Sequence, residues 1–218
     1  MEEISAESKI KIKRILFYGD SNTYGYDPRS FVGGRYPENV RWTGVLKRRL
    51  APETSVYADG MNGRPVPASE DAVRSAKWSL LRVGPLDLFA VMLGSNDLLD
   101  SREGAEKTVR VTAFHLQNFL ERIMDLKMKV DGGSGPAVQQ ALVIAPPQIG
   151  PGSWGSDALE QERKMLSEAY RMAACQNGWS FADSAEWQCE LSADGVHLTA
   201  DGHKCFADHM EKAIHGLF

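Results

Sequence analysis

The chain has 218 residues, a formal net charge of −4 at pH 7, 43% hydrophobic residues and 25% charged residues. These values are close to globular averages and exclude a disordered or fibrous chain, and the length favours one domain over residues 1–218. Because affinity for phosphates requires clustered Lys and Arg, the acidic balance argues against nucleic acids and anionic membranes as partners.

The N-terminal segment and the cysteines favour a cytoplasmic protein. Residues 1–8 are acidic and lack the basic and apolar regions of a secretory signal peptide, so we expect a cytoplasmic location. Cys175, Cys189 and Cys205 are odd in number and have no Cys-x-x-Cys spacing. This set fits free thiols in a reducing compartment better than a disulfide framework.

Predicted strands and helices alternate through the first half of the chain. The apolar patterns predict, in order, a strand over 10–18, a helix over 42–50, a strand over 54–58, a helix over 69–83 and a strand over 86–93. Pro52 follows the first helix as a stop signal, Ser69 can cap the second helix, and Gly84 ends it.

The alternation continues through the second half. The patterns predict a helix over 104–129, a strand over 141–145, a helix over 157–177, a strand over 179–183 and a last helix that Thr199 can cap. Residues 131–136 are rich in glycine and are typical of a flexible turn. Apolar strands that alternate with helices favour right-handed crossovers and a parallel sheet covered on both faces, so the predicted fold class is α/β.

Short polar motifs follow three of the predicted strands, and a fourth precedes the last helix. They are Gly19-Asp20-Ser21-Asn22, Asp59-Gly60, Gly94-Ser95-Asn96-Asp97 and Asp194-Gly195-Val196-His197. Ligands bind beyond the carboxyl ends of parallel strands, so the first three motifs are expected to lie near one another. Each motif alone is typical of a turn or a helix cap, and only their combination favours a catalytic site.

The four motifs together contain the groups that serine catalysis needs. A serine hydroxyl is a weak nucleophile at neutral pH and requires a base and a group that orients the base. His197 is the predicted base for Ser21, and Asp194 is predicted to orient the imidazole. The predicted oxyanion donors are the backbone N–H groups of Ser21 and Gly60 and the side-chain amide of Asn96.

Neither a metal ion nor a cofactor is expected. Four histidines recur every six residues, at positions 197, 203, 209 and 215. Six residues advance a helix by about 600°, so successive side chains lie on different faces, and the chain has no His-Glu-x-x-His string. The histidine spacing therefore predicts no metal site.

The motifs resemble the four blocks of the SGNH (GDSL-type) hydrolase superfamily in order and spacing. The matching residues are Gly19-Asp20-Ser21, Gly60, Gly94-x-Asn96-Asp97 and Asp194-x-x-His197. The resemblance implies a flavodoxin-like three-layer α/β/α sandwich with a parallel five-stranded sheet, and esterase or acyltransferase chemistry. Segments 19–25, 41–42 and 60–64 look most like the bacterial arylesterase and acyltransferase branch. Some members of that branch form oligomers, so a homo-oligomer is one expectation.

Two features depart from related patterns. Asn22 stands where the first block usually has Leu or Ile, which predicts a more polar acyl pocket. The chain also lacks Gly-x-Ser-x-Gly around Ser21, which separates it from the α/β-hydrolases. Four aromatic residues are weaker candidates for lining the pocket, because aromatic side chains more often pack in a core: Tyr24, Trp42, Trp154 and Trp187.

The predicted function is a serine esterase that acts on small or short-chain esters through an acyl-enzyme. A thioesterase or a carbohydrate deacetylase with the same site is an open alternative, and the sequence does not distinguish hydrolysis from acyl transfer. From another class, the alternative is a non-catalytic α/β domain that binds a ligand or a protein at the same strand ends.

Overall fold

A computed structural model of the chain describes residues 13–30, 32, 34–130 and 133–217. Its main sheet contains five parallel strands in the order β2-β1-β3-β6-β7, and their bounds are β1 Arg14–Gly19, β2 Ser55–Gly60, β3 Leu86–Met92, β6 Val138–Ala145 and β7 Ser180–Asp183. When the strands of this sheet are numbered in chain order, they lie in the order 2-1-3-4-5, which is the flavodoxin-like order. Ile10, Ile12 and the acidic segment 1–8 lie outside the described residues.

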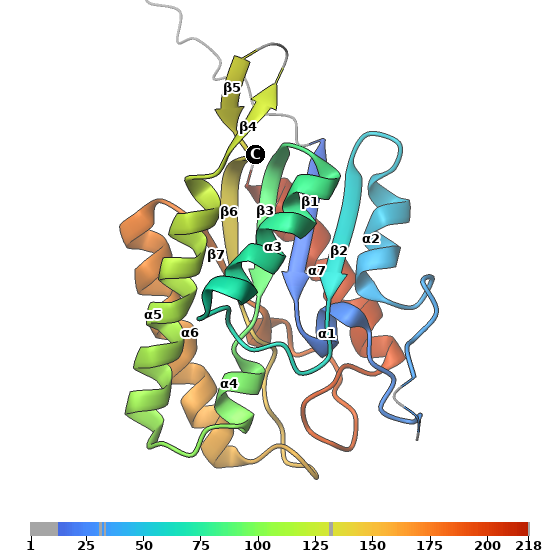
Figure 1. The fold of residues 1–218 in the computed structure, drawn as a ribbon. Coiled ribbons are helices and arrows are strands. Elements are labelled where there is room, and N and C mark those ends of the chain that lie inside the picture. Colours follow the sequence, from blue (N-terminus) through green and yellow to red (C-terminus); the bar gives the residue numbers. More distant parts are fainter. Residues whose placement is uncertain (1–12, 31, 33, 131–132, 218) are drawn as a thin grey trace, which may run out of the picture.

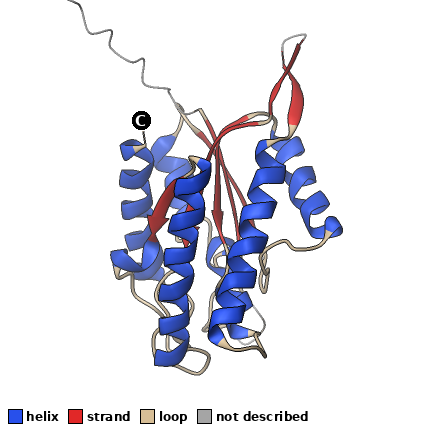
Figure 2. Cartoon of the chain, turned by 90° about the vertical axis from the view of Figure 1, so that its left-hand side faces the viewer, coloured by secondary structure: helices blue, strands red, loops and turns tan. Residues whose placement is uncertain are grey.

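Helices cover both faces of the sheet in three layers (Figures 1 and 2). The five long helices are α2 Trp42–Leu50, α3 Glu70–Val83, α5 Ala105–Met124, α6 Asp157–Asn177 and α7 Ala200–Gly216. Helices α3, α5 and α6 pack in one apolar cluster, and α2 and α7 pack in the other. The predicted α/β class and three-layer sandwich are therefore confirmed.

Strand β1 shows why the sequence forms a sheet that is buried on both sides. Leu16 and Tyr18 belong to the cluster under α3, α5 and α6, whereas Ile15 and Phe17 belong to the cluster under α2 and α7. Successive side chains of a strand point to opposite faces, so a continuous apolar run fills both clusters. All four side chains are at most 3% exposed.

Several predicted helix ends are found in the structure. The hydroxyl of Ser69 accepts from the N–H of Ala72, and that of Thr199 accepts from the N–H of Gly202. Gly84 ends α3 with a positive φ of 83°. Three short elements were not predicted, since each spans one turn or little more: α1 Ser21–Tyr24, α4 Ser95–Leu99 and the 3-10 helix η1 Ser184–Trp187.

The predicted helix over 104–129 extends too far, and the segment 131–136, predicted as a flexible turn, contains a strand of a hairpin. Helix α5 ends at Met124, and β4 Lys127–Val130 pairs antiparallel with β5 Gly133–Pro136. Residues 127–130 alternate polar and apolar, and Asp131-Gly132 is a pair that favours two-residue hairpin turns, although these two residues lie outside the described ranges. The alternation with period two therefore overrides the helical pattern here.

The expectation of free thiols is wrong for two of the three cysteines. Cys189 and Cys205 form a disulfide with their Cα atoms 5.6 Å apart, and Cys175 is free and exposed. The disulfide joins the segment after η1 to α7. The two cysteines are 16 residues apart in sequence, so only the packing of that segment against α7 brings them together.

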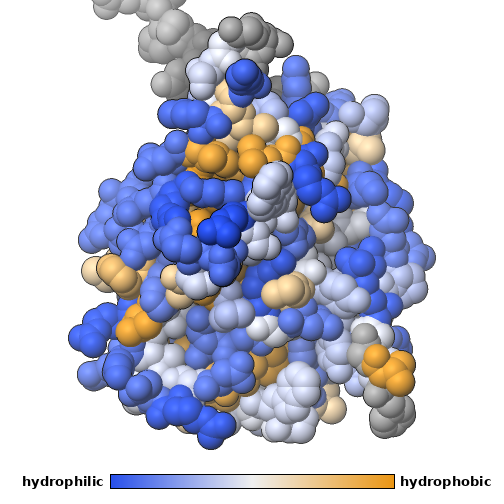
Figure 3. Space-filling model, in the orientation of Figure 1, coloured by the Kyte–Doolittle hydropathy of each residue, from blue (hydrophilic) through white to orange (hydrophobic). Residues whose placement is uncertain are grey.

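The surface of the described part gives no indication of a membrane span. None of its helices is both long and apolar enough to cross a bilayer. The face seen in Figure 3 is largely hydrophilic, with apolar side chains in separate areas. Leu81 and Trp78 of α3 are among the exposed apolar residues.

Candidate active site

Ser21 is the first residue of α1 and lies directly beyond the carboxyl end of β1 (Figure 1). The side chain of Asp20 caps this helix by accepting from the N–H of Asn22 at 3.0 Å. A side chain at Gly19 would collide with the side chain of Thr23, so a glycine is required for the chain to turn this sharply. The short strand-to-helix turn fixes the Ser21 hydroxyl at the edge of the sheet, where the residue is 7% exposed.

A continuous hydrogen-bond chain joins Ser21, His197 and Asp194. The Nε2 atom of His197 lies 2.9 Å from Oγ of Ser21, and Nδ1 lies 2.8 Å from Oδ2 of Asp194. His197 is 4% exposed. The three residues that the sequence predicts as nucleophile, base and orienting group are thus brought together in the predicted order.

The Asp194 carboxylate is held in its ionised form. Its Oδ1 accepts from the N–H groups of Val196 and His197, each at 2.9 Å. Burial acts to raise the pKa of Asp194, but the hydrogen bonds from the ring and backbone of His197, from Ser192 and from Val196 outweigh it and leave the pKa below its usual range. A carboxylate that stays ionised can stabilise a positive charge on the His197 ring.

The loop between β6 and α6 packs against Asp194 and donates hydrogen bonds to its backbone. The backbone carbonyl of Asp194 accepts from the N–H groups of Trp154 and Gly155 at 3.0 and 3.1 Å. A side chain at Gly152 would collide with the Asp194 backbone, and Gly195 has a positive φ of 79°. The two loops therefore pack backbone against backbone, which glycines make possible.

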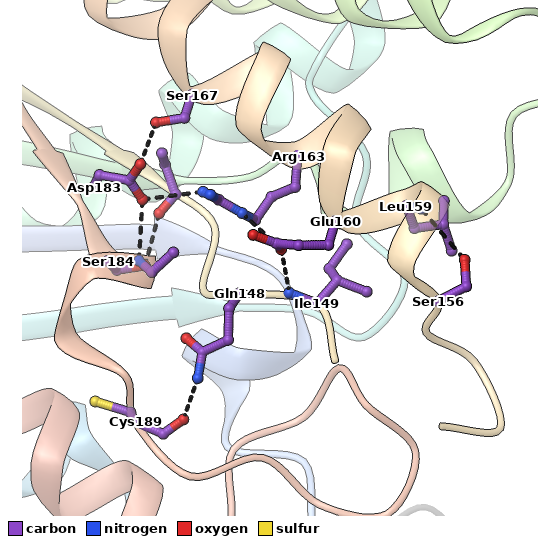
Figure 4. A network of polar contacts seen from close by, with 12 residues as sticks. Gln148, Ile149, Ser156, Leu159, Glu160, Arg163, Ser167, Asp183, Ser184 and Cys189 are labelled. Carbon is purple, nitrogen blue, oxygen red and sulfur yellow. Dashed lines mark hydrogen bonds and ion pairs between the residues drawn. The ribbon is translucent and has the colours of Figure 1, made fainter. Parts of the chain in front are cut away.

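A buried ionic network anchors that loop to α6 and β7 (Figure 4). Arg163 lies 3.0 Å from Glu160 and 3.0 Å from Asp183, and its side chain is 4% exposed. Glu160 accepts from the N–H of Ile149 at 2.8 Å, and Asp183 accepts from the hydroxyl of Ser167 at 2.5 Å. The network thus fixes the beginning of the loop that bears Trp154.

Gly60 and Asn96 lie at the ends of the two strands that flank β1. Gly19 of β1 pairs with Gly60 of β2 on one side and with Met92 of β3 on the other. A side chain at Gly60 would collide with the backbone of Tyr24, so β2 approaches α1 backbone to backbone. Asn96 lies in the first turn of α4. The three predicted oxyanion donors are therefore on three neighbouring strand ends.

The polarity of the acyl pocket stays a prediction, but both polar atoms of the Asn22 side chain have partners within the protein. Its Nδ2 donates to the carbonyl of Val196 at 3.1 Å, and its Oδ1 accepts from the N–H of Leu198 at 3.0 Å. The residue is 2% exposed. Asn22 instead fastens α1 to the two residues on either side of His197. The sequence reveals the unusual residue but gives no signal for partners more than 170 positions away.

Two aromatic rings contact His197. The ring centroids of Tyr26 and Trp154 lie 4.6 and 5.2 Å from that of His197. Trp154 is 53% exposed, whereas Trp42 is fully buried in the core. Among the weaker aromatic candidates, the exposed Trp154 beside His197 is the one suited to touch a ligand, and Tyr26 was missed because nothing in its sequence context marks it.

Two carboxyl groups adjoin site residues in sequence, the buried Asp20 and the partly buried Asp97. Burial raises the pKa of Asp20 from 3.8 to about 6, against the opposing hydrogen bond from Asn22. Burial likewise raises the pKa of Asp97 to about 6, against the hydrogen bond from the N–H of Val66. Asp20 precedes Ser21 and Asp97 follows Asn96, so both acids belong to the framework of the site.

The described residues contain no group of three or more His, Cys, Asp or Glu side chains placed to hold a metal ion. His203 is fully buried and packs edge-on against Tyr36, with ring centroids 5.3 Å apart. Burial lowers the pKa of His203 to about 4, so its ring is neutral at pH 7.

A doubly wound parallel sheet with a serine, histidine and aspartate hydrogen-bonded at its carboxyl edge is an arrangement typical of hydrolases. Residues 17–205 match the model of the GDSL-like Lipase/Acylhydrolase family. The chain therefore belongs to this family and to the SGNH hydrolase superfamily, as the motifs predicted. No curated protein sequence matches the chain at a significant level.

Solved structures with the same fold include several esterases. A putative arylesterase from Agrobacterium tumefaciens str. C58 is 26% identical with a TM-score of 0.79, and the match covers 95% of this chain and 100% of that one. The native M. smegmatis aryl esterase is 25% identical with a TM-score of 0.76, over 94% and 100% of the two chains. A carbohydrate acetylesterase family member from Sinorhizobium meliloti is 27% identical with a TM-score of 0.75, over 93% and 97%. Family and neighbours together support an ester hydrolase.

Proposed function

We propose that the protein is a serine esterase that hydrolyses small or short-chain acyl esters through an acyl-enzyme on Ser21. The observation that carries this proposal is the hydrogen-bond chain from Ser21 Oγ to His197 Nε2, at 2.9 Å, and from His197 Nδ1 to Asp194 Oδ2, at 2.8 Å. Membership of an acylhydrolase family supports the same reaction class. A purely ligand-binding domain would have no need of this chain.

In the proposed reaction, His197 removes the proton of the Ser21 hydroxyl while Oγ attacks the ester carbonyl carbon. The ionised Asp194 stabilises the imidazolium that forms and holds Nδ1 as the donor. The tetrahedral intermediate then expels the alcohol, which takes the proton from His197. Water attacks the acyl-enzyme with His197 again as base, releases the carboxylic acid and restores Ser21.

The proposed oxyanion donors are the N–H groups of Ser21 and Gly60 and the side-chain amide of Asn96. They suit this role because an alkoxide is stabilised by preorganised donors, and these three groups lie on adjacent strand ends of a rigid sheet. The amide of Asn96 is itself oriented by donation to the carbonyl of Arg64 at 3.1 Å.

A second candidate substrate class is acetylated carbohydrate. The indole of Trp154, 53% exposed and edge-on to His197, offers a flat apolar face beside the proposed base. Such a face suits a sugar or aryl ring on the alcohol side of the ester. One structural neighbour is a carbohydrate acetylesterase family member from Sinorhizobium meliloti, which supports the same candidate. Thioester hydrolysis and transfer to an acceptor alcohol use the same acyl-enzyme.

The experiment that tests the function is hydrolysis of p-nitrophenyl esters from acetate to dodecanoate by the wild type, Ser21→Ala and Ser75→Ala. Ser75 is an exposed serine of α3 and serves as a matched control. We expect the highest turnover with the shortest acyl chains, none in Ser21→Ala, and wild-type turnover in Ser75→Ala. A fluorophosphonate should label the wild type and the control only.

Equal turnover in the wild type and Ser21→Ala would contradict the proposal, as would a fluorophosphonate that labels both proteins. To compare substrate classes, the wild type and Trp154→Ala are both assayed with an acetylated monosaccharide and with p-nitrophenyl acetate. A larger loss in Trp154→Ala on the sugar acetate than on p-nitrophenyl acetate would favour the carbohydrate candidate.

A further inference from the structure

Arg64 is a buried arginine that lies outside the four sequence motifs and outside the proposed reaction. The residue is 8% exposed. Its Nη1 donates to the carbonyl of Gly19 at 2.9 Å and to the carbonyl of Asp59 at 2.5 Å, and its Nη2 donates to Oδ1 of Asp59 at 2.7 Å. The guanidinium also lies over the ring of Tyr18, 4.1 Å from the centroid.

These contacts reach the last residues of two neighbouring strands. Gly19 ends β1 and is two residues before Ser21, and Asp59 is directly before Gly60 at the end of β2. The carbonyl of Gly19 also accepts from the N–H of Met61 at 3.2 Å, so the guanidinium adds a second donor where β1 and β2 end. One guanidinium bonds both ends with a fixed planar geometry.

The backbone of Arg64 reaches the third strand end. Its carbonyl accepts from Nδ2 of Asn96 at 3.1 Å. Two residues further, the N–H of Val66 donates to the carboxyl oxygens of Asp97 at 3.0 and 3.3 Å. The segment 64–66 is therefore bonded to two successive residues of α4, and Arg64 contacts residues at or just beyond the three strand ends near the proposed oxyanion donors.

We propose that Arg64 is a positioning residue for the oxyanion site: its side chain fixes the ends of β1 and β2, and its carbonyl fixes the side chain of Asn96. The inference rests on the proposed function, because it assigns a geometric role within that site. A donor triad stabilises an alkoxide only when all three groups point at one oxygen position, so a common anchor for their three strands sets the shape of the site.

A positioning role for Arg64 can be distinguished from a purely structural role, because the two predict different effects of removing the side chain. Removal of a merely structural arginine lowers the free energy of unfolding, while the folded molecules that remain keep their turnover. Removal of Arg64 is expected to misalign the donors within folded molecules, which lowers kcat and leaves KM nearly unchanged, because the donors act on the transition state rather than on the bound ester.

The experiment compares the wild type, Arg64→Met, Arg64→Lys, Asn96→Ala and the double variant R64M/N96A, all at a temperature where circular dichroism shows them folded. We expect Arg64→Met to lose about 10²-fold in kcat, the loss that follows a small misplacement of reacting groups. Arg64→Lys should show an intermediate loss, because an ammonium can satisfy one carbonyl but lacks the planar fork. Arg122→Met, which removes an exposed ion pair with Glu70, is the control.

Two further readouts separate the oxyanion role from a general loss of activity. The effects of Arg64→Met and Asn96→Ala should be far less than multiplicative in the double variant, since both act on one group of donors. Phenyl acetate should lose more turnover than phenyl thionoacetate in Arg64→Met, because a thionoester sulfur accepts hydrogen bonds weakly and depends less on the donors.

Wild-type kcat in Arg64→Met, multiplicative effects in the double variant, or equal losses on the two esters would each overturn the role of Arg64. The Ser21→Ala variant in the same assay keeps this outcome separate from the proposed function. If Ser21→Ala is inactive and Arg64→Met is fully active, the esterase proposal stands and the positioning proposal fails.

Discussion

The two sides of the candidate site are held by two buried arginines that differ in their partners. Arg64, on the side of Gly60 and Asn96, gives two of its three hydrogen bonds to backbone carbonyls. Arg163, behind the loop that contacts Asp194, bonds the carboxylates of Glu160 and Asp183 (Figure 4). One arginine therefore links strand ends, and the other neutralises two acids.

This difference separates two tasks that a buried cation performs. Loss of Arg163 leaves two largely buried carboxylates without their cationic partner, which strongly destabilises the folded state. Loss of Arg64 leaves one carboxylate, Asp59, which is 25% exposed along its side chain and can be hydrated. The physical expectation is that Arg163 acts mainly on stability and Arg64 mainly on the geometry of the oxyanion donors.

The largest effect is expected at Asp194, the end of the hydrogen-bond chain that runs from Ser21 through His197. Asp194→Asn should lower kcat by about 10⁴-fold, because an amide cannot stabilise the imidazolium and favours the wrong tautomer. Steady-state kinetics with p-nitrophenyl acetate measures it. Asp208→Asn, which changes a half-exposed carboxylate paired with Arg49, is the matched control and should keep wild-type turnover. An active Asp194→Asn enzyme would argue that Asp194 is not the orienting group.

Arg163→Met tests the stability side of the comparison. Removing one partner of a buried ion pair should lower the free energy of unfolding by about 3–5 kcal/mol, measured by urea titration. Arg122→Met, at an exposed pair, should change it by about 1 kcal/mol or less. Turnover per folded Arg163→Met molecule should stay near that of the wild type. A kcat loss as large as that of Arg64→Met would break the distinction between the two arginines.

Asn96→Ala tests whether the Asn96 amide is an oxyanion donor. Removing one donor should lower kcat by about 10²–10³-fold, with a much smaller change in KM, because the missing hydrogen bond forms with the transition state. Asn39→Ala, at an exposed position, is the control. If KM rises while kcat is constant, the amide binds the ground-state ester instead.

Asp20→Asn gives the smallest effect, a change in the pH dependence of stability. Burial raises the pKa of Asp20 to about 6, so the folded state keeps this proton to a higher pH than the unfolded state does. Relative to Asp20→Asn, the wild type should lose stability as the pH rises from 4 to 6, by up to about 3 kcal/mol. Urea titrations of both proteins at several pH values measure the difference. A constant difference across this range would mean that Asp20 does not titrate there.

Much of the fold followed from local pattern. The bounds of α6, 157–177, agree with the prediction, because an amphipathic repeat and the Ser156 cap define them locally. The end of α5 was predicted five residues too late, because the strand-forming segment 127–130 becomes stable only through its pairing with residues 133–136. The roles of the site residues, the cytoplasmic location, the single domain and the homo-oligomer stay predictions.

The amino-acid sequence alone was enough to predict the alternating strands and helices, the α/β class, the family, and the four motifs that supply Ser21, Gly60, Asn96 and the Asp194–His197 pair. These features depend on periodicity and short-range spacing, which a chain displays without folding. Three features became visible only in the folded protein: the pairing of Cys189 with Cys205, the bonds of Asn22 across more than 170 residues, and the position of Arg64 among three strand ends. Such contacts are set by which strands become neighbours, and hydrogen bonds between distant segments leave no periodic trace in the sequence.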